Sequence, residues 1–121
     1  MTKTKSNNWL GGWGERIAAQ HLSRAGMQIL ERNWRCSAGE IDLVLRDGGT
    51  LVICEVKTRR DDRFGHPLEA IDEAKVERLH RLAALWQEER QVRPVDVRLD
   101  AVGVLLPKYG AASIEHVRGI G

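Results

Sequence analysis

The sequence predicts a layered domain of the α/β or α+β class, in which two helices pack on a mainly β core. At 121 residues the chain is long enough for one domain. Polar and apolar residues alternate on both sides of Gly48-Gly49, a pattern typical of a β-hairpin. Residues 67–89 instead carry apolar residues at helical spacing. We expect a single domain over residues 9–121, preceded by a flexible segment at residues 1–8.

The first helix is expected to begin after one of residues 6–8 and to end near Ala25, because Gly26 is a typical C-terminal cap. Three strands should follow it, at residues 28–35, 39–47 and 50–58.

A polar loop at residues 59–66 leads to Pro67, which suits the first turn of a long helix ending near Glu89. His66 is expected to cap this helix. Gly103 is a candidate bulge in the first of two final strands, residues 95–106 and 112–118.

Charge is nearly balanced, with 19 basic and 17 acidic side chains, so the chain has no strong overall field. Residues 1–60 carry ten basic and six acidic side chains, which weakly favours a polyanion near the hairpin. Cys36 and Cys54 lack metal-site spacing, which favours a reduced protein. Without a hydrophobic leader or ~20 consecutive apolar residues, we expect a soluble cytoplasmic protein that does not contact membranes.

The hairpin register brings like charges together. If Gly48-Gly49 form the turn, Asp42 lies opposite Glu55, and Glu40 lies opposite Lys57. Two carboxylates that close repel each other unless a proton or a cation lies between them, so the pattern is typical of a divalent metal site. A longer turn would make Asp42 and Glu55 diagonal neighbours and keep the cluster.

The opposite face of the hairpin is apolar and must be buried. It carries Ile41, Leu43 and Leu45 on one strand and Val52, Cys54 and Val56 on the other.

Glu55-x-Lys57 places a carboxylate and an amine on one strand face, because side chains alternate along a strand. Two carboxylates suit a hard cation such as Mg²⁺, and a lysine can orient or deprotonate an attacking water. These residue types together suit phosphodiester hydrolysis. The alternative is a surface ladder in which Lys57 pairs with Glu40 and Glu55.

Two helical charges lie on apolar faces. Glu15 either caps a turn or points into a site, and its face carries Ala18, Ala19 and Leu22. Lys75 either extends to solvent or reaches the carboxylates, and its face carries Leu68, Ile71, Leu79 and Leu82.

Arg59, Arg60 and Arg63 follow the Glu-x-Lys strand and could grip phosphates. The alternative is that they pair with Asp61 and Asp62 in a solvated loop. Arg98 and Asp100 share a strand face and are interpreted as a structural pair near the site. The tryptophans are interpreted as core or groove packing rather than base-stacking platforms, and they are Trp9, Trp13, Trp34 and Trp86.

Taken together, these motifs resemble the YraN family of small bacterial proteins, over about residues 9–118. The resemblance is carried by Gly14-Glu15, Asn33-Trp34-Arg35, Gly39-Glu40-Ile41-Asp42-Leu43-Val44, Glu55-Val56-Lys57-Thr58-Arg59, Phe64-Gly65, Pro67, Glu69-Ala70, Lys75 and Arg98-Leu99-Asp100. That family is similar to archaeal Holliday-junction resolvases of the PD-(D/E)xK superfamily. The resemblance implies a restriction-endonuclease-like three-layer α/β fold, with an αβββαβ core whose central mixed sheet is flanked by helices.

The resemblance also implies roles. Asp42, Glu55 and Lys57 match the catalytic set, with Glu15 as the helix glutamate that helps hold metal. Mg²⁺ or Mn²⁺ would then be bound by Glu15, Asp42 and Glu55. Lys75 matches a helix lysine that is a site accessory in some members. Ile41 departs from the pattern, which often has proline before the aspartate.

The leading hypothesis is a metal-dependent endonuclease that cuts DNA rather than RNA, on branched or junction structures, and acts as a homodimer. In this reading Arg59, Arg60, Arg63 and Lys75 bind the nucleic acid. One alternative is a nucleic-acid-binding module without cleavage, and another is an adaptor that docks through its long helix.

Overall fold

The computed structural model describes residues 9–61, 63 and 65–121. The helices are α1 (Trp9–Arg24), the short 3₁₀ helix η1 (Pro67–Ala70) and α2 (Glu73–Arg90). The strands are β1 (Gln28–Cys36), β2 (Gly39–Asp47), β3 (Thr50–Arg59), β4 (Asp96–Leu105) and β5 (Ser113–Arg118). They form one mixed sheet in chain order, with β3 and β4 parallel and the other neighbours antiparallel. The expected order of α-helices and strands is confirmed, and the expectation for residues 1–8 lies outside the described residues.

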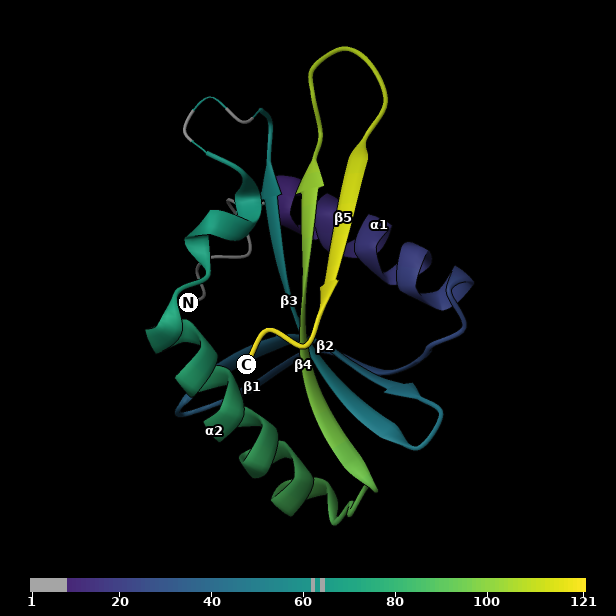
Figure 1. Cartoon of the computed structure of the whole chain (residues 1–121), viewed down its shortest axis with the longest axis vertical. Coiled ribbons are helices and arrows are strands. Elements are labelled where there is room, and N and C mark those ends of the chain that lie inside the picture. Colours follow the sequence, from purple (N-terminus) through teal and green to yellow (C-terminus); the bar gives the residue numbers. More distant parts are fainter. Residues whose placement is uncertain (1–8, 62, 64) are drawn as a thin grey trace.

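Two hydrophobic cores on opposite faces of the sheet make three layers. Ala18 and Leu22 of α1 pack against one face, and Leu79 and Leu82 of α2 pack against the other. In Figure 1, α1 (purple) passes behind β3, β4 and β5, while α2 (green) runs along the other side of the sheet. The structure is therefore an α/β domain with a five-stranded mixed sheet flanked by helices.

Strand β3 is buried on both faces between these helices. Val52 and Cys54 belong to the α1 core, whereas Leu51 and Ile53 belong to the α2 core. A strand covered on both faces reads as a continuous apolar run rather than as an alternation. The polar face expected for the hairpin therefore exists only beyond this run, from Glu55 onward.

Ile41 is expected on the same face of the hairpin as Leu43 and Leu45, but it lies on the opposite face. Leu43 and Leu45 pack under α1 as predicted, but Ile41 packs with Trp34 in the α2 core. Beyond Leu43, strand β2 is paired only with β1, in which Asn33 takes a left-handed φ of 54°. The change of face at Ile41 therefore coincides with the point where β2 loses β3 as a partner and the backbone of β1 is irregular.

The second helix begins later than predicted. Pro67 opens η1, whose cap His66 accepts a hydrogen bond at Nδ1 from the Leu68 amide at 3.1 Å, as expected of a capping residue. The chain then becomes extended at Ile71, and α2 starts only after Asp72 accepts a hydrogen bond from the Lys75 amide at 2.9 Å. Leu68 and Ile71 therefore leave the predicted helical stripe.

Gly103 is not a bulge, because its pairing with β3 and β5 is continuous. It is small for another reason: a Cβ there would lie 3.0 Å from Leu68 and 3.1 Å from His66, so η1 packs directly on it. The register shift of the sheet lies instead in β1, between Ile29 and Glu31.

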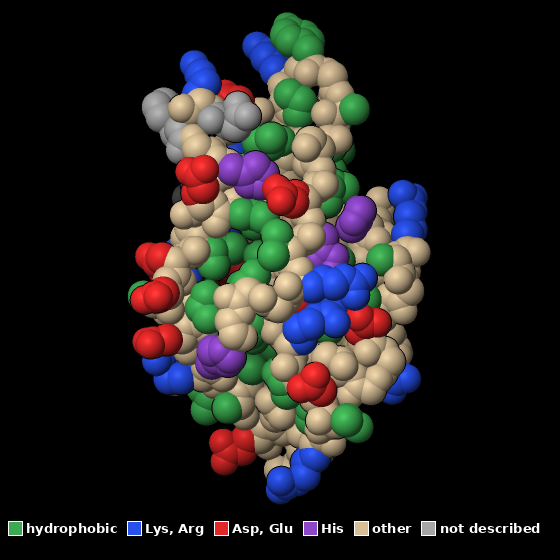
Figure 2. All heavy atoms as spheres, viewed as in Figure 1, with side chains coloured by type: hydrophobic (Ala, Val, Ile, Leu, Met, Phe, Trp, Pro, Cys, Tyr) green, Lys and Arg blue, Asp and Glu red, His purple; other side chains and the backbone are tan. Residues whose placement is uncertain are grey.

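In the part of the chain that the structure describes, no helix is long and apolar enough to cross a membrane. The longest, α2, exposes Glu73, Glu77 and Glu88, and Figure 2 shows acidic side chains along its outer edge.

Helix α1 approaches the sheet most closely at Gly14, where an added Cβ would overlap Thr58 Oγ1 and lie 2.7 Å from Thr58 Cγ2. We predict that Gly14→Ala lowers the free energy of unfolding by about 1–3 kcal/mol, because overpacking forces the helix away from β3. Urea denaturation would measure the change. Gly12→Ala is the matched control: nothing lies within 4 Å of its Cβ, so this variant should be as stable as the wild type or slightly more stable. Equal stability of the two variants would contradict this packing.

Candidate functional site

The β2–β3 ladder stops where the candidate site begins. The predicted register holds from Asp47–Thr50 to Leu43–Cys54. The expected pairs Asp42–Glu55 and Glu40–Lys57 lie beyond that last ladder pair. In place of a backbone partner, the Val56 amide donates a hydrogen bond to Asp42 Oδ2 at 2.8 Å. The Asp42 carboxyl is therefore drawn toward β3, on which Glu55 and Lys57 lie.

The half-buried Asp42 is surrounded by other acids. Burial and the negative charge of Glu55 raise the pKa of Asp42 well above its usual value, and Glu15 and Glu40 add to the effect. The hydrogen bond from Val56 opposes the shift without cancelling it. The repulsion expected between Asp42 and Glu55 is thus present without a direct cross-strand pair.

Asn33 links two of these acids. With its side-chain amide oriented to satisfy both neighbours, it donates to Glu15 Oε1 at 2.9 Å and to Glu40 Oε2 at 3.2 Å. The close contact of Gly14 with Thr58 brings α1 down to the sheet, and the left-handed φ of Asn33 aims its side chain. Of the two interpretations of Glu15, the structure favours the one in which it points into the cluster.

The two lysines of the candidate site lie together. Lys57 Nζ is 3.3 Å from Glu55 Oε2, whereas Glu40 pairs with Arg35 at 3.6 Å instead of with Lys57. The charge of Lys57, followed by burial, lowers the pKa of Lys75. Lys75 therefore points from the start of α2 toward Lys57 rather than away from the site.

The three arginines at and after the end of β3 make different contacts. Arg63 pairs with Asp61 at 3.1 Å, as the solvated-loop alternative predicted, while Asp62 lies outside the described residues, as does Phe64 of the resemblance motif. The Arg60 guanidinium lies 5.1 Å from the centre of the Trp9 ring. Arg59 is exposed at the end of β3.

Asp100 forms a separate and structural network. It is fully buried, and Arg98 donates to it from Nε at 2.8 Å, as the predicted pair requires. Burial opposes its ionisation, but the hydrogen bonds from Arg98 and His116 lower the pKa of Asp100 below its usual value. All three residues serve to anchor β5 and the chain after it to β4.

Within the described residues, no three His, Cys, Asp or Glu side chains converge closely enough to enclose a metal ion as they lie. The donor chemistry nevertheless suits a hard cation, since Asp42, Glu55 and Glu15 offer only carboxylate oxygens and repel one another. Glu55 engages Lys57, and Asp42 engages the Val56 amide, through one oxygen each.

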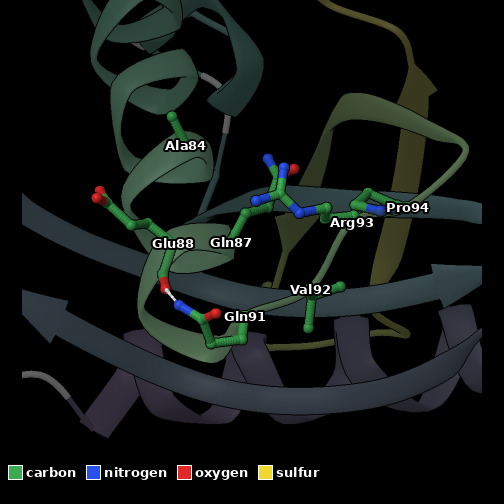
Figure 3. Close-up of a pocket in the computed structure, with 7 residues that line it drawn as sticks. All are labelled: Ala84, Gln87, Glu88, Gln91, Val92, Arg93 and Pro94. Atoms are coloured by element: carbon green, nitrogen blue, oxygen red, sulfur yellow. Dashed lines mark hydrogen bonds between the residues drawn. The ribbon is translucent and has the colours of Figure 1, made fainter.

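Cavities on the described surface include two of similar volume. One, of about 410 Å³, lies at the C-terminal end of α2, where Figure 3 shows Gln87, Gln91 and Arg93 among its lining residues, and it contains none of the predicted site residues. The other, of about 460 Å³, lies between the start of α1 and β1–β2 and includes Glu15 and Glu40 in its wall.

The sequence placed Glu40 in the charged face of the hairpin without a role in the site, and it gave Asn33 no place there. Glu40 has a usable signal, because it stands two residues before Asp42 on the same strand. Asn33 has a weaker one, since asparagine tolerates the left-handed conformation that it adopts here. The contact of Asn33 with Glu15 depends on how α1 packs, so no local pattern could predict it.

The raised pKa of Asp42 predicts a pH-dependent gain in stability for Asp42→Asn in EDTA. Above the ordinary pKa of 3.8 the unfolded chain releases a proton that the folded chain holds, so this group destabilises the fold increasingly as pH rises. The variant should therefore gain about 1 kcal/mol, or ~4 °C in Tm, at pH 8 and little near pH 4.

Asp47→Asn is the matched control on the same strand. Asp47 lies 3.2 Å from both Arg98 and Arg118, so its neutralisation should lower Tm at pH 8. A loss of stability in Asp42→Asn at pH 8 would show that the carboxylate repulsion is not the dominant effect.

Comparison with known proteins places these residues in a family. A model described as "Uncharacterised protein family UPF0102" matches residues 14–104. A UPF0102 protein of a Nocardioides species is 57% identical over 112 residues, covering 93% of this chain and 90% of its own. Those of Beutenbergia cavernae and Streptomyces coelicolor are 50% and 55% identical, covering 97% and 92% of this chain and 99% and 87% of their own. The chain belongs to the UPF0102 family.

Proposed function

We propose that this protein is a metal-dependent nuclease that hydrolyses phosphodiester bonds of DNA. One observation carries the proposal: a half-buried aspartate among three glutamates, beside a lysine on the neighbouring strand. Carboxylates that repel one another cost folding stability, so their gathering at the open end of the β2–β3 hairpin is better explained by chemistry than by packing.

The arrangement of elements supports a restriction-endonuclease-like core. The chain runs α1, β1, β2, β3, α2, β4, with the parallel pair β3–β4 at the connection through α2 and helices on both faces. The proposed catalytic residues lie where β2 and β3 leave their ladder, with Glu15 supplied by α1.

In the proposed reaction, a water molecule loses a proton to solvent, its oxygen bonds to phosphorus while an ester P–O bond breaks, and the departing alkoxide takes up a proton from solvent. Asp42, Glu55 and Glu15 would hold Mg²⁺ or Mn²⁺. Such a cation lowers the pKa of a bound water and offsets charge on phosphoryl oxygens. Lys57 would orient the water and, with Lys75 beside it, offset the negative charge that develops on the phosphate.

The alternative of a binding module or adaptor without cleavage finds less support. Glu15, Glu40, Asp42 and Glu55 together would repel phosphates in a pure nucleic-acid binder. Preference for branched DNA and action as a homodimer stay predictions, to be tested by substrate comparison and by light scattering.

We expect cleavage of labelled DNA in Mg²⁺ or Mn²⁺ to fall by about 10²-fold or more in Glu55→Gln and in Lys57→Met. Junction, flap, single-stranded and linear duplex substrates would be compared with matching RNA. Glu88→Gln, on the exposed side of α2, is the matched charge control and should cut like the wild type. Cleavage that persists in both site variants would come from a contaminant or another site and would contradict the assignment.

Metal binding can be tested without cleavage. Addition of Mg²⁺ should raise the Tm of the wild type, because a ligand that binds only the folded state stabilises it by mass action. Asp42→Asn should lose most of this rise, while Asp47→Asn should keep it. An undiminished response in Asp42→Asn would exclude Asp42 from the metal site.

A further inference from the structure

The four tryptophans divide into two kinds. Trp34 and Trp86 are buried in the α2 core, and the indole N–H of Trp86 donates to Glu31 at 3.0 Å. Trp9 and Trp13 instead expose 65% and 51% of their surfaces. They stand four residues apart on α1, so their rings lie on one face of the helix. Large aromatic side chains left in water at neighbouring positions need another explanation than packing.

Both residues line the cavity of about 460 Å³ between α1 and the β1–β2 strands. A cavity of this size suits a ligand of about one nucleotide. Arg16, Arg32 and Arg35 share the wall with the tryptophans. Aromatic rings interleaved with arginines form the combination that stacks bases and contacts backbone phosphates.

A cation already lies over each ring. The guanidinium of Arg60 is 5.1 Å from the centre of the Trp9 ring, and that of Arg16 is 5.9 Å from the Trp13 ring. These contacts hold the arginines on one side of each ring. The remaining exposed surface is available to a second planar group, with positive charge beside it for a phosphate.

The cavity adjoins the candidate active site. Glu15 and Glu40 belong to its wall, and both accept hydrogen bonds from Asn33. The same two glutamates raise the pKa of Asp42. A nucleotide held by Trp9 and Trp13 would therefore have its neighbouring phosphate close to the carboxylates and to Lys57.

We infer that this cavity, the α1 tryptophan pocket, binds an unpaired nucleotide next to the phosphate to be cut. The inference rests on the proposed nuclease function and gives it a substrate class: DNA with a single-stranded or locally unstacked segment. A base inside a continuous duplex is stacked on both faces and cannot offer one to a tryptophan. Continuous duplex DNA is therefore the poorer ligand of this pocket.

The test is binding in EDTA, where the proposed cleavage cannot proceed. Fluorescence anisotropy would follow the full chain with labelled oligothymidylate of about 16 nucleotides, and with a labelled duplex of the same length. The wild type should prefer the single strand. Trp9→Leu and Trp13→Leu should each weaken single-strand binding by roughly tenfold, with much smaller effects on the duplex. Because both side chains are exposed, the variants should keep the wild-type Tm.

Tyr109→Leu is the matched control. Tyr109 is an aromatic residue with 82% of its surface exposed, and Lys108 lies 5.9 Å from its ring centre, but it is not part of the pocket wall. Its replacement should leave binding of both DNAs unchanged. Single-strand affinity unaffected by either tryptophan variant would overturn the inference, as would equal losses for single strand and duplex. Binding of neither DNA by the wild type would also overturn it and point to another occupant, such as a protein segment.

Failure of this inference and failure of the proposed function give different results. Tryptophan-dependent binding without cleavage of any substrate would leave the pocket in place and remove the nuclease. Cleavage that needs Glu55 and Lys57, combined with binding that does not depend on Trp9 and Trp13, would support the nuclease and exclude the pocket as its nucleotide site.

Discussion

The rest of the structure depends on strand β3 being hydrogen-bonded on both edges and covered on both faces. Pairing with β2 and β4 satisfies its backbone, and the α1 and α2 cores take its side chains on alternate sides. Under such cover an unpaired charge would be too costly, so Leu51 to Cys54 are all apolar. Charge can appear on this strand only after the β2 ladder ends, which is where Glu55 and Lys57 stand.

The end of that ladder also creates the electrostatic conflict of the candidate site. A buried amide without a strand partner needs another acceptor. The Val56 amide finds one in the carboxyl of Asp42, to which it donates a hydrogen bond. This hydrogen bond favours ionised Asp42, while burial and three neighbouring glutamates disfavour its ionisation. The second group of effects is larger, so the pKa of Asp42 is raised. Asp42 is thus needed as a hydrogen-bond acceptor by the Val56 amide, while its negative charge is repelled by the neighbouring glutamates. Binding of a cation would satisfy both, because ionised Asp42 could keep its hydrogen bond.

The alternation of polar and apolar residues and the spacing of charged residues predict those parts of the structure that are formed by neighbouring residues in the sequence. The glycine turn set the hairpin register correctly, and Glu-x-Lys placed Glu55 and Lys57 on one face. Ile41 lies in the other core because the alternation on which the prediction relied does not continue past Leu43, where the β2–β3 ladder ends. Asn33–Glu15 and Lys75–Lys57 join different elements, so they follow from helix packing and have no signature in any short stretch of sequence.

In the proposed nuclease, the charges at the site indicate that the groups that bind the substrate would differ from those that cleave it. Glu15, Glu40, Asp42 and Glu55 outnumber the basic neighbours Lys57, Lys75 and Arg35, so without a cation a phosphate would meet repulsion there. Affinity must then come from outside the carboxylates, and the α1 tryptophan pocket is the adjoining surface that combines arginines with aromatic rings. In the proposed nuclease, the pocket would hold the nucleic acid, and the cation would determine whether the phosphate beside it can approach Asp42 and Glu55.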